Sequence, residues 1–293
     1  MFKIYDVIST NGHYADKGTK VKYWYELNGK NSLIKMNRYE NDIEVRSLGV
    51  SEKIFSEIAN YLEFNCVSID FIKDENGKYG IASYDYKLGD MNIISGDDLY
   101  IMAFLPLPPK SEKRYIDKNY FYEDIQKILK YYNATLLKEF NKIILMDALT
   151  GEMDRHYENW GIYETNNQYF LLPMFDNATC LLHQFRKKSE LEKFIQNGNL
   201  NNYSDRSFCK IKYKGKKIKH FDFISDLLND LPQELSEDLK ENILKLKKIS
   251  DDYINDLINK IPEELCSLEH KRLIVEYIII RRDKLLSLVG EYK

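Results

Sequence analysis

The chain has 293 residues, 44% of them hydrophobic, and its 43 lysines and arginines against 46 aspartates and glutamates give a net charge of −3. This length suits one bilobal unit or two modest domains, each with its own core. The near-balanced charge lacks the basic excess of bulk nucleic-acid binders, so no direct nucleic-acid partner is expected.

The sequence carries no sign of a membrane or secretory segment. No run approaches the roughly eighteen apolar residues that a membrane span needs, and the start, Met1–Asp6, lacks the apolar core of a signal peptide. The scattered cysteines fit neither a disulfide framework nor a zinc site. Abundant Tyr, Lys, Ile and Asn resemble the coding bias of AT-rich bacteria. We therefore expect a bacterial cytoplasmic protein, with export by a route without a cleaved signal left open.

The first elements predicted are a polar loop and a β-hairpin. Residues 9–18 contain two glycines, and backbone N–H groups around Ser9 and Gly12 could cradle phosphate oxygens, although G-x-G-x-x-G is not matched. Residues 20–36 alternate around an Asn-Gly pair, which predicts a hairpin. Lys35 lies between apolar neighbours on the second strand. A buried ammonium is costly unless paired, so by itself this pattern favours a lysine that points to solvent.

A helix and a strand follow the hairpin. Apolar residues recur at helical spacing through residues 51–62, with Glu52 in the first turn and Glu57 in the second. Glu52 could simply stabilise the helix dipole from that position. Residues 78–86 indicate a strand that runs into a linker.

The remainder of the chain is mostly helical. Prolines in 105–109 mark a loop, and apolar stripes predict helices at 122–132, 134–149, 187–196, 221–230, 233–247, 250–260 and 263–289. Residues 210–219 alternate lysines with apolar residues around Gly215. This pattern indicates a short exposed hairpin; the alternative is a docking patch for an acidic partner or an RNA that a substrate carries.

The strongest motif joins Asp154 and Asn159, five residues apart, to Asp176, seventeen residues further on. Residues 160–172 read as two β-prone runs around Asn166-Asn167, a hairpin pattern that would bring Asn159 and Asp176 together at its open end. Carboxylate and amide oxygens suit Mg²⁺, and a phosphoryl-transfer enzyme needs this trio. An ordinary polar turn is the competing interpretation, because Asp and Asn are common in loops.

The run D-R-H-x-x-N-W-G, then P-x-F-D, then the Cys-Leu pair at 180–181 resembles the HipA-like serine/threonine kinases, and in particular their short, single-chain CtkA-type branch. The similarity extends diffusely from about residue 20 to the C-terminus. It implies an α+β, bilobal protein-kinase-like fold, with a small β-rich N-lobe at 1–104 and a larger, mostly α-helical C-lobe at 105–293. It also implies ATP and Mg²⁺ as cofactors.

The resemblance assigns roles residue by residue. Asp154 matches the catalytic-loop Asp, Asn159 the metal-binding Asn, and Asp176 the metal-binding Asp of the D-F-G position. His156 is expected to brace the loop. Arg155 could contact a phosphate or stiffen the loop through a salt bridge. The chain has Glu152 where the family often has Asn. The resemblance therefore does not fix the orientation of the preceding turn, whereas the three catalytic and metal-binding positions are unaffected.

In the N-lobe, the resemblance makes Lys35 the phosphate-binding lysine, with Glu52 as its partner and Glu57 as the alternative. Ser9 and Gly12 would cover the phosphates, and Ser9 or Thr10 could be an autophosphorylation site. The strand 78–86 becomes the hinge strand, with adenine contacts expected at Ala82, Ser83, Tyr84 and Asp85.

The predicted activity is transfer of the ATP γ-phosphate to a protein hydroxyl, with autophosphorylation as a further expectation. The protein substrate is unnamed; an aminoacyl-tRNA synthetase or a host protein is a candidate class. A separate antitoxin or N-terminal module is a candidate partner. Two alternatives stay open, namely a lipid or small-molecule kinase and a catalytically inactive kinase-fold binding or toxin module.

Overall fold

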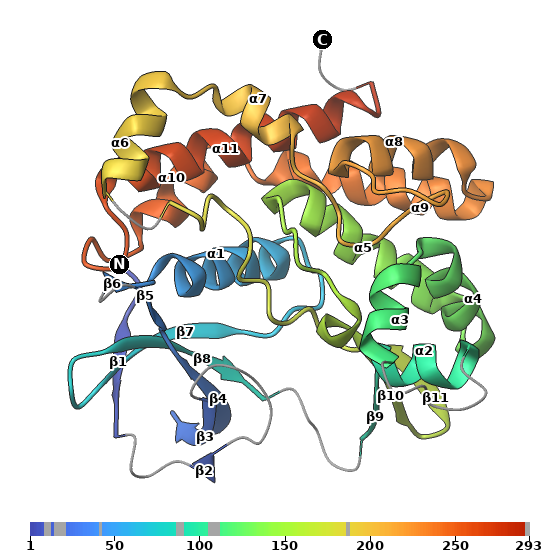
Figure 1. Ribbon diagram of the computed structural model, residues 1–293, viewed down its shortest axis with the longest axis horizontal. Coiled ribbons are helices and arrows are strands. Elements are labelled where there is room, and N and C mark those ends of the chain that lie inside the picture. Colours follow the sequence, from blue (N-terminus) through green and yellow to red (C-terminus); the bar gives the residue numbers. More distant parts are fainter. Residues whose placement is uncertain are drawn as a thin grey trace. The chain divides into compact units, whose positions relative to one another are not determined.

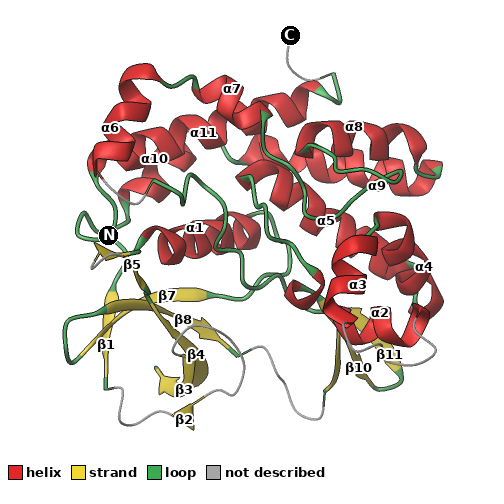
Figure 2. Cartoon of the chain, in the orientation of Figure 1, coloured by secondary structure: helices red, strands yellow, loops and turns green. Residues whose placement is uncertain are grey.

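Figure 1 shows the computed structural model, which describes residues 1–8, 13–14, 22–40, 43–85, 91–104, 112–185 and 188–290. The chain forms two compact units. The first comprises Met1–Tyr86, Asn177–Leu200 and Ile249–Ile279, and the second comprises Lys87–Asp176, Asn201–Lys248 and Ile280–Lys293. The first unit combines a curled β-sheet with several helices, and helices dominate the second (Figure 2). Among the described residues, no helix has both the length and the apolarity that a membrane crossing requires.

The first unit is built on a six-stranded sheet in the order β1-β7-β8-β4-β3-β2. Only β1 and β7 pair in parallel; the other neighbours are antiparallel. The strands are β1 (Ile4–Val7), β2 (His13–Tyr14), β3 (Lys22–Leu27), β4 (Lys30–Met36), β7 (Ile69–Asp74) and β8 (Tyr79–Tyr84). The unit also contains β5 (Tyr39–Glu40), β6 (Ile43–Glu44), α1 (Ser47–Tyr61), α6 (Lys188–Asn197), α10 (Asp251–Asn259) and part of α11 (Leu268–Ser287).

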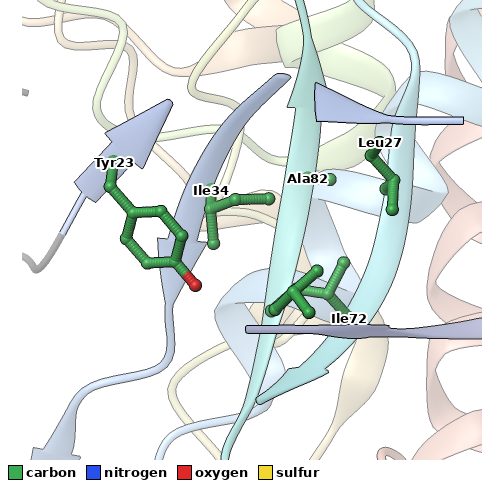
Figure 3. Close-up of a cluster of buried hydrophobic side chains, with 6 residues drawn as sticks. Tyr23, Leu27, Ile34, Ile72 and Ala82 are labelled. Carbon is green, nitrogen blue, oxygen red and sulfur yellow. The ribbon is translucent and has the colours of Figure 1, made fainter. Parts of the chain in front are cut away.

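The predicted hairpin at 20–36 is confirmed as β3 and β4. Its turn residues Asn28 and Gly29 have φ values of 54° and 72°, the left-handed geometry of the hairpin turn that an Asn-Gly pair favours. One face of the sheet carries a buried cluster of side chains that point toward one another (Figure 3). Its members are Val7, Tyr23, Leu27, Ile34, Ile72 and Ala82.

Helix α1 packs against β7 and covers the opposite face. A Cβ added at Gly49 would lie 3.0 Å from the Ile81 side chain, so the helix approaches the sheet closely at this glycine. The predicted apolar stripe of the helix is buried apart from Tyr61, whose ring stacks on Tyr253 at 4.0 Å between centroids. The helix begins at Ser47, four residues before the predicted start.

The second unit surrounds one buried helix, α5, which packs against α4, α8, α9 and β11. Twelve of its sixteen residues are buried, most of them apolar, while Lys138, Glu139 and Lys142 are not among the buried residues. The elements of the unit are α2 (Gly96–Phe104), α3 (Glu112–Asn119), α4 (Tyr122–Tyr132), α5 (Thr135–Thr150), α8 (His220–Asp230), α9 (Gln233–Leu244), the 3₁₀ turns η2 (Tyr157–Asn159) and η3 (Lys245–Lys248), most of α7 (Leu200–Asp205) and the end of α11.

A small sheet in the same unit has the order β11-β10-β9. Its strands are β9 (Asn92–Ser95), β10 (Gly161–Thr165) and β11 (Gln168–Leu171). The hairpin predicted at 160–172 is therefore confirmed, whereas β9, which pairs with β10, was not predicted from the sequence.

The lysine-rich segment also forms the hairpin expected as its simpler interpretation. Phe208 pairs with Lys219, Tyr213 pairs with Lys216, and the turn lies at Lys214-Gly215. Lys214 contacts Asp230 at 2.6 Å. The final helix was predicted from residue 263 but begins at Leu268, because residues 263–266 form turns after Pro262.

Candidate active site

The helical unit presents the motif of the sequence on a loop and a hairpin. Helix α5 ends at Gly151, whose φ of 74° turns the chain in a left-handed conformation that glycine tolerates best. Beyond the loop, β10 and β11 pair antiparallel, with Thr165 opposite Gln168. The turn residues Asn166 and Asn167 have φ values of 50° and 58°, a conformation that asparagine adopts more readily than most residues.

Arg155 connects the two ends of this hairpin. Its Nη1 donates hydrogen bonds to the carbonyl oxygen of Asn159 at 3.1 Å and to that of Phe175 at 3.2 Å. Phe175 directly precedes Asp176, so one guanidinium fixes the backbone beside both predicted metal ligands. The expectation that Arg155 stiffens the loop agrees with these contacts.

A buried carboxylate orients Arg155 in turn. Arg155 donates through Nε and Nη2 to the two carboxylate oxygens of Asp147, at 3.1 and 2.8 Å. Burial lowers the pKa of Arg155, but the charge and hydrogen bond of Asp147, together with the smaller effects of Glu152 and Tyr120, raise the pKa above its ordinary value. The guanidinium therefore keeps its charge inside the unit. A two-point pair of this kind fixes direction as well as distance.

Hydrogen bonds hold both the N–H and the carbonyl group of Asp154. Its N–H donates to Oε1 of Glu152 at 2.8 Å. Its carbonyl oxygen accepts from the His156 N–H at 2.7 Å and from Nδ2 of Asn159 at 2.9 Å. The Asp154 side chain is 49% exposed, and its carboxylate lies 4.0 Å from Nε2 of His156. A fixed backbone with an accessible carboxylate is what a residue that orients an incoming hydroxyl requires.

Asn159 and Asp176 provide oxygen atoms that fit Mg²⁺ in kind. The Asn159 amide donates through Nδ2 to Asp154, which leaves Oδ1 as its acceptor atom. Asp176 has a φ of 55°, a conformation uncommon outside glycine that concentrates at functional positions. Within the described ranges, no group of three or more His, Cys, Asp and Glu side chains could hold a metal. Two protein oxygens match the way Mg²⁺ usually binds, with water and substrate phosphates completing its shell.

In the sheet unit, Lys35 contacts Glu52. Lys35 Nζ lies 2.7 Å from Glu52 Oε1, and their side chains are only 8% and 2% exposed. Successive strand residues face opposite sides of a sheet, so Lys35 and its neighbour Ile34 lie on opposite faces. Helix α1 covers the face that carries Lys35. Glu52 comes from that helix, in its second turn; the interpretation of Glu52 as a first-turn dipole partner is therefore wrong. Glu57 pairs instead with Lys53, also at 2.7 Å.

The residues predicted to contact adenine lie at the end of β8. Ala82, Ser83 and Tyr84 are paired with β4 on one side, and β7 flanks the strand on the other. The Asp85 N–H donates to the carbonyl of Asn31 at 2.9 Å. The ladders thus engage much of this backbone, and the adenine contacts stay a prediction. Ser9, Thr10 and Gly12 lie outside the described residues.

Three further residues support the loop and were not predicted. Asp147 orients Arg155 from the preceding helix. His220 contacts the carbonyl of Glu152 at 2.8 Å through Nε2, and Arg281 donates to the carbonyl of Ala148 at 2.7 Å. His220 and Arg281 lie far along the chain from the motif, so no local pattern could have placed them. Asp147 follows an apolar run of the predicted helix, and an acidic residue beside buried positions was the only signal that the sequence offered.

The chain is similar in sequence to known proteins. The HipA-like C-terminal domain model matches residues 7–255. A serine/threonine-protein kinase, CtkA of Helicobacter pylori strain J99, is 30% identical over 119 residues, which cover 39% of this chain and 34% of the relative. The match thus spans about a third of that curated protein.

Solved structures show the same fold. The crystal structure of the Helicobacter pylori proinflammatory kinase CtkA matches with a TM-score of 0.77 and 19% identity, over 98% of this chain and 96% of that one. HipA in a Shewanella oneidensis complex with HipB and operator DNA matches with a TM-score of 0.53 and 13% identity, over 96% and 65%.

These matches confirm the expected fold class, an α+β protein-kinase-like fold with a β-rich lobe and a larger helical lobe. The homology supports a kinase-type function. The chain belongs to the HipA-like C-terminal domain family.

Proposed function

We propose that this chain is an ATP- and Mg²⁺-dependent serine/threonine protein kinase that transfers the γ-phosphate of ATP to a protein hydroxyl. The observation that carries the proposal is the convergence on Arg155, which holds the backbone beside Asn159 and Asp176. The same loop presents Asp154 with a fixed backbone and a half-exposed carboxylate. The family and the name of the curated relative support a kinase over other uses of the site.

Bound ATP would supply the phosphoryl group, and Mg²⁺ would offset the charge on it. Asp154 would accept a hydrogen bond from the acceptor hydroxyl, orient it, and take its proton as the new phosphate ester forms. Oδ1 of Asn159 and the Asp176 carboxylate would hold the metal ion. The protein would act by positioning and charge, without a covalent intermediate on the enzyme.

Lys35 would bind the phosphates of ATP, and Glu52 would hold its ammonium in place. The Glu52 carboxylate, 2.7 Å from the Lys35 ammonium, gives it a defined position. Ala82, Ser83, Tyr84 and Asp85, at the end of β8, would contact adenine.

Phosphate transfer from γ-labelled ATP to a mixed Ser/Thr peptide library tests the proposal. We expect transfer that needs Mg²⁺, stops when EDTA removes it, and falls by at least about 10³-fold in Asp154→Ala, since this removes the group that orients the hydroxyl. Asn159→Ala and Asp176→Asn should raise the Mg²⁺ concentration needed for half-maximal activity. Activity unchanged by Asp154→Ala would refute the assignment.

The two alternatives give different outcomes. A lipid or small-molecule kinase would label extracted lipids or metabolites but no peptide, as mass spectrometry of the products would show. A kinase-fold binding module would transfer no label to any acceptor while remaining folded. We also propose a separate antitoxin-like protein as a partner, by analogy with the HipA–HipB complex; co-purification from the native host would test this.

A further inference from the structure

The catalytic loop contains a buried carboxylate that none of the assigned roles uses. Glu152 is 1% exposed and lies two residues before Asp154. The left-handed Gly151 directs the chain so that the Glu152 N–H still bonds to the carbonyl of Asp147, at 3.0 Å, as part of the end of α5. Its side chain then folds forward along the loop, and Oε1 accepts the Asp154 N–H at 2.8 Å.

The backbone of Glu152 is fixed by a second, distant residue. Nε2 of His220 lies 2.8 Å from the Glu152 carbonyl oxygen, and Nδ1 lies 2.9 Å from Oγ of Ser207. Burial, with a contribution from the Arg281 charge, lowers the pKa of His220 to about 3, so the ring is neutral near pH 7. A carbonyl can only accept, so the ring proton lies on Nε2, and Nδ1 faces the Ser207 hydroxyl as an acceptor.

Arg281 completes this support from α11. It is fully buried and donates to the Ala148 carbonyl at 2.7 Å and to Oγ of Ser207 at 2.8 Å. The last turn of α5 and the partner of His220 are thus held by one side chain. The backbone of Glu152 is therefore held in place, and its carboxylate in turn holds the N–H of Asp154.

We propose that Glu152 is a positioning residue for phosphoryl transfer: it fixes the Asp154 peptide and thereby sets the direction of the Asp154 carboxylate. The inference rests on the proposed function, in which Asp154 orients the acceptor hydroxyl. The half-exposed Asp154 side chain has a long ionic contact, 4.0 Å from His156, so the peptide is its main constraint. An error of about 1 Å in such a group can cost on the order of 10²-fold in rate.

Residue 152 must place an acceptor atom within hydrogen-bond distance of the Asp154 N–H, and its negative charge is secondary. Glutamine keeps an oxygen in the place of Oε1, whereas alanine removes it and aspartate draws it back by one methylene group. The difference between glutamine and alanine at residue 152 therefore separates positioning of Asp154 from general support of the fold.

The experiment compares Glu152→Gln and Glu152→Ala in the full chain, with Glu158→Ala as a matched control. Glu158 is an exposed carboxylate of the same loop and lies 3.9 Å from Nδ1 of His156. Steady-state kinetics with γ-labelled ATP and the Ser/Thr peptide library give kcat and the KM for ATP. We expect Glu152→Ala to lower kcat on the order of 10²-fold with little change in KM, and Glu152→Gln and Glu158→Ala to stay within about threefold of the unsubstituted chain.

Hydrogen exchange of the Asp154 amide provides a readout that does not depend on activity. We expect faster exchange in Glu152→Ala and unchanged exchange in Glu152→Gln. The inference is overturned if Glu152→Ala retains kcat, if glutamine is as damaging as alanine, or if the amide exchanges equally in all variants. A failure of the proposed function looks different: the unsubstituted chain and Asp154→Ala would then have equal activity.

Discussion

Removing Glu52 from beside Lys35 is expected to destabilise the sheet unit strongly. At 2.7 Å the Coulomb attraction is about 6 kcal/mol for an effective dielectric constant of about 20, and the cost of burying two charges offsets most of it. The net worth of the pair is thus small. Glu52→Ala, however, leaves an ammonium without its carboxylate at a position only 8% exposed, which should cost about 3–5 kcal/mol.

Urea unfolding monitored by fluorescence, with hydrogen exchange of the β4 and α1 peptides, measures this loss. Glu57→Ala is the matched control: it removes a carboxylate from the same helix at the same 2.7 Å from a lysine. Glu57 is 36% exposed, and Lys53 keeps Asp70 at 3.3 Å and the Ile69 carbonyl at 2.6 Å, so about 1 kcal/mol or less is expected. The double variant Lys35→Met/Glu52→Leu should recover most of the stability yet transfer no phosphate. A loss below about 1 kcal/mol for Glu52→Ala would refute the reasoning.

Three further predictions concern the helical unit. Arg155→Lys should lower kcat at least tenfold and lower Tm, because an ammonium cannot replace the fork that reaches Asp147 and two carbonyls; unchanged kinetics would contradict this. The pKa of His220 is about 3 in the folded chain against an ordinary 6.5, so its contribution to stability is complete above pH 6.5 and is lost as pH falls. The contribution should fall by about 2 kcal/mol between pH 6.5 and 5, and His220→Gln should show a shallower pH dependence in urea unfolding. Asn167→Gly should stabilise the hairpin by up to about 1 kcal/mol and Asn167→Val should destabilise it by about 1–2 kcal/mol, since the φ of 58° at this residue suits glycine. Thermal unfolding measures both changes, and the reverse order of stability would contradict the prediction.

Local sequence patterns predicted the elements whose causes are local. The Asn28-Gly29 and Asn166-Asn167 turns encode their hairpins because each pair adopts left-handed backbone angles. The start of α1 was missed because Arg46 provides no side-chain cap and Gly49 weakens the helical pattern. Strand β9 was missed since its ladder depends on a partner some seventy residues away.

The same distinction applies to the candidate site. Spacing alone indicated Asp154, Asn159 and Asp176, because they lie on one loop and one hairpin. The pairing partner of Lys35 needed the resemblance, since either glutamate of the helix was compatible with the sequence. The contacts of His220 and Arg281 depend on the packing of α8 and α11, which no motif records.

The conformation of the loop is stabilised largely by residues outside the loop. Transplanting the nine residues 151–159 onto another helical scaffold would carry the chemistry but not the angles, because the recipient would lack the carboxylate, imidazole and guanidinium beneath them. A successful graft would have to import these three supports as well. For the same reason, searches for distant relatives gain more from matching that buried trio in space than from extending the linear motif.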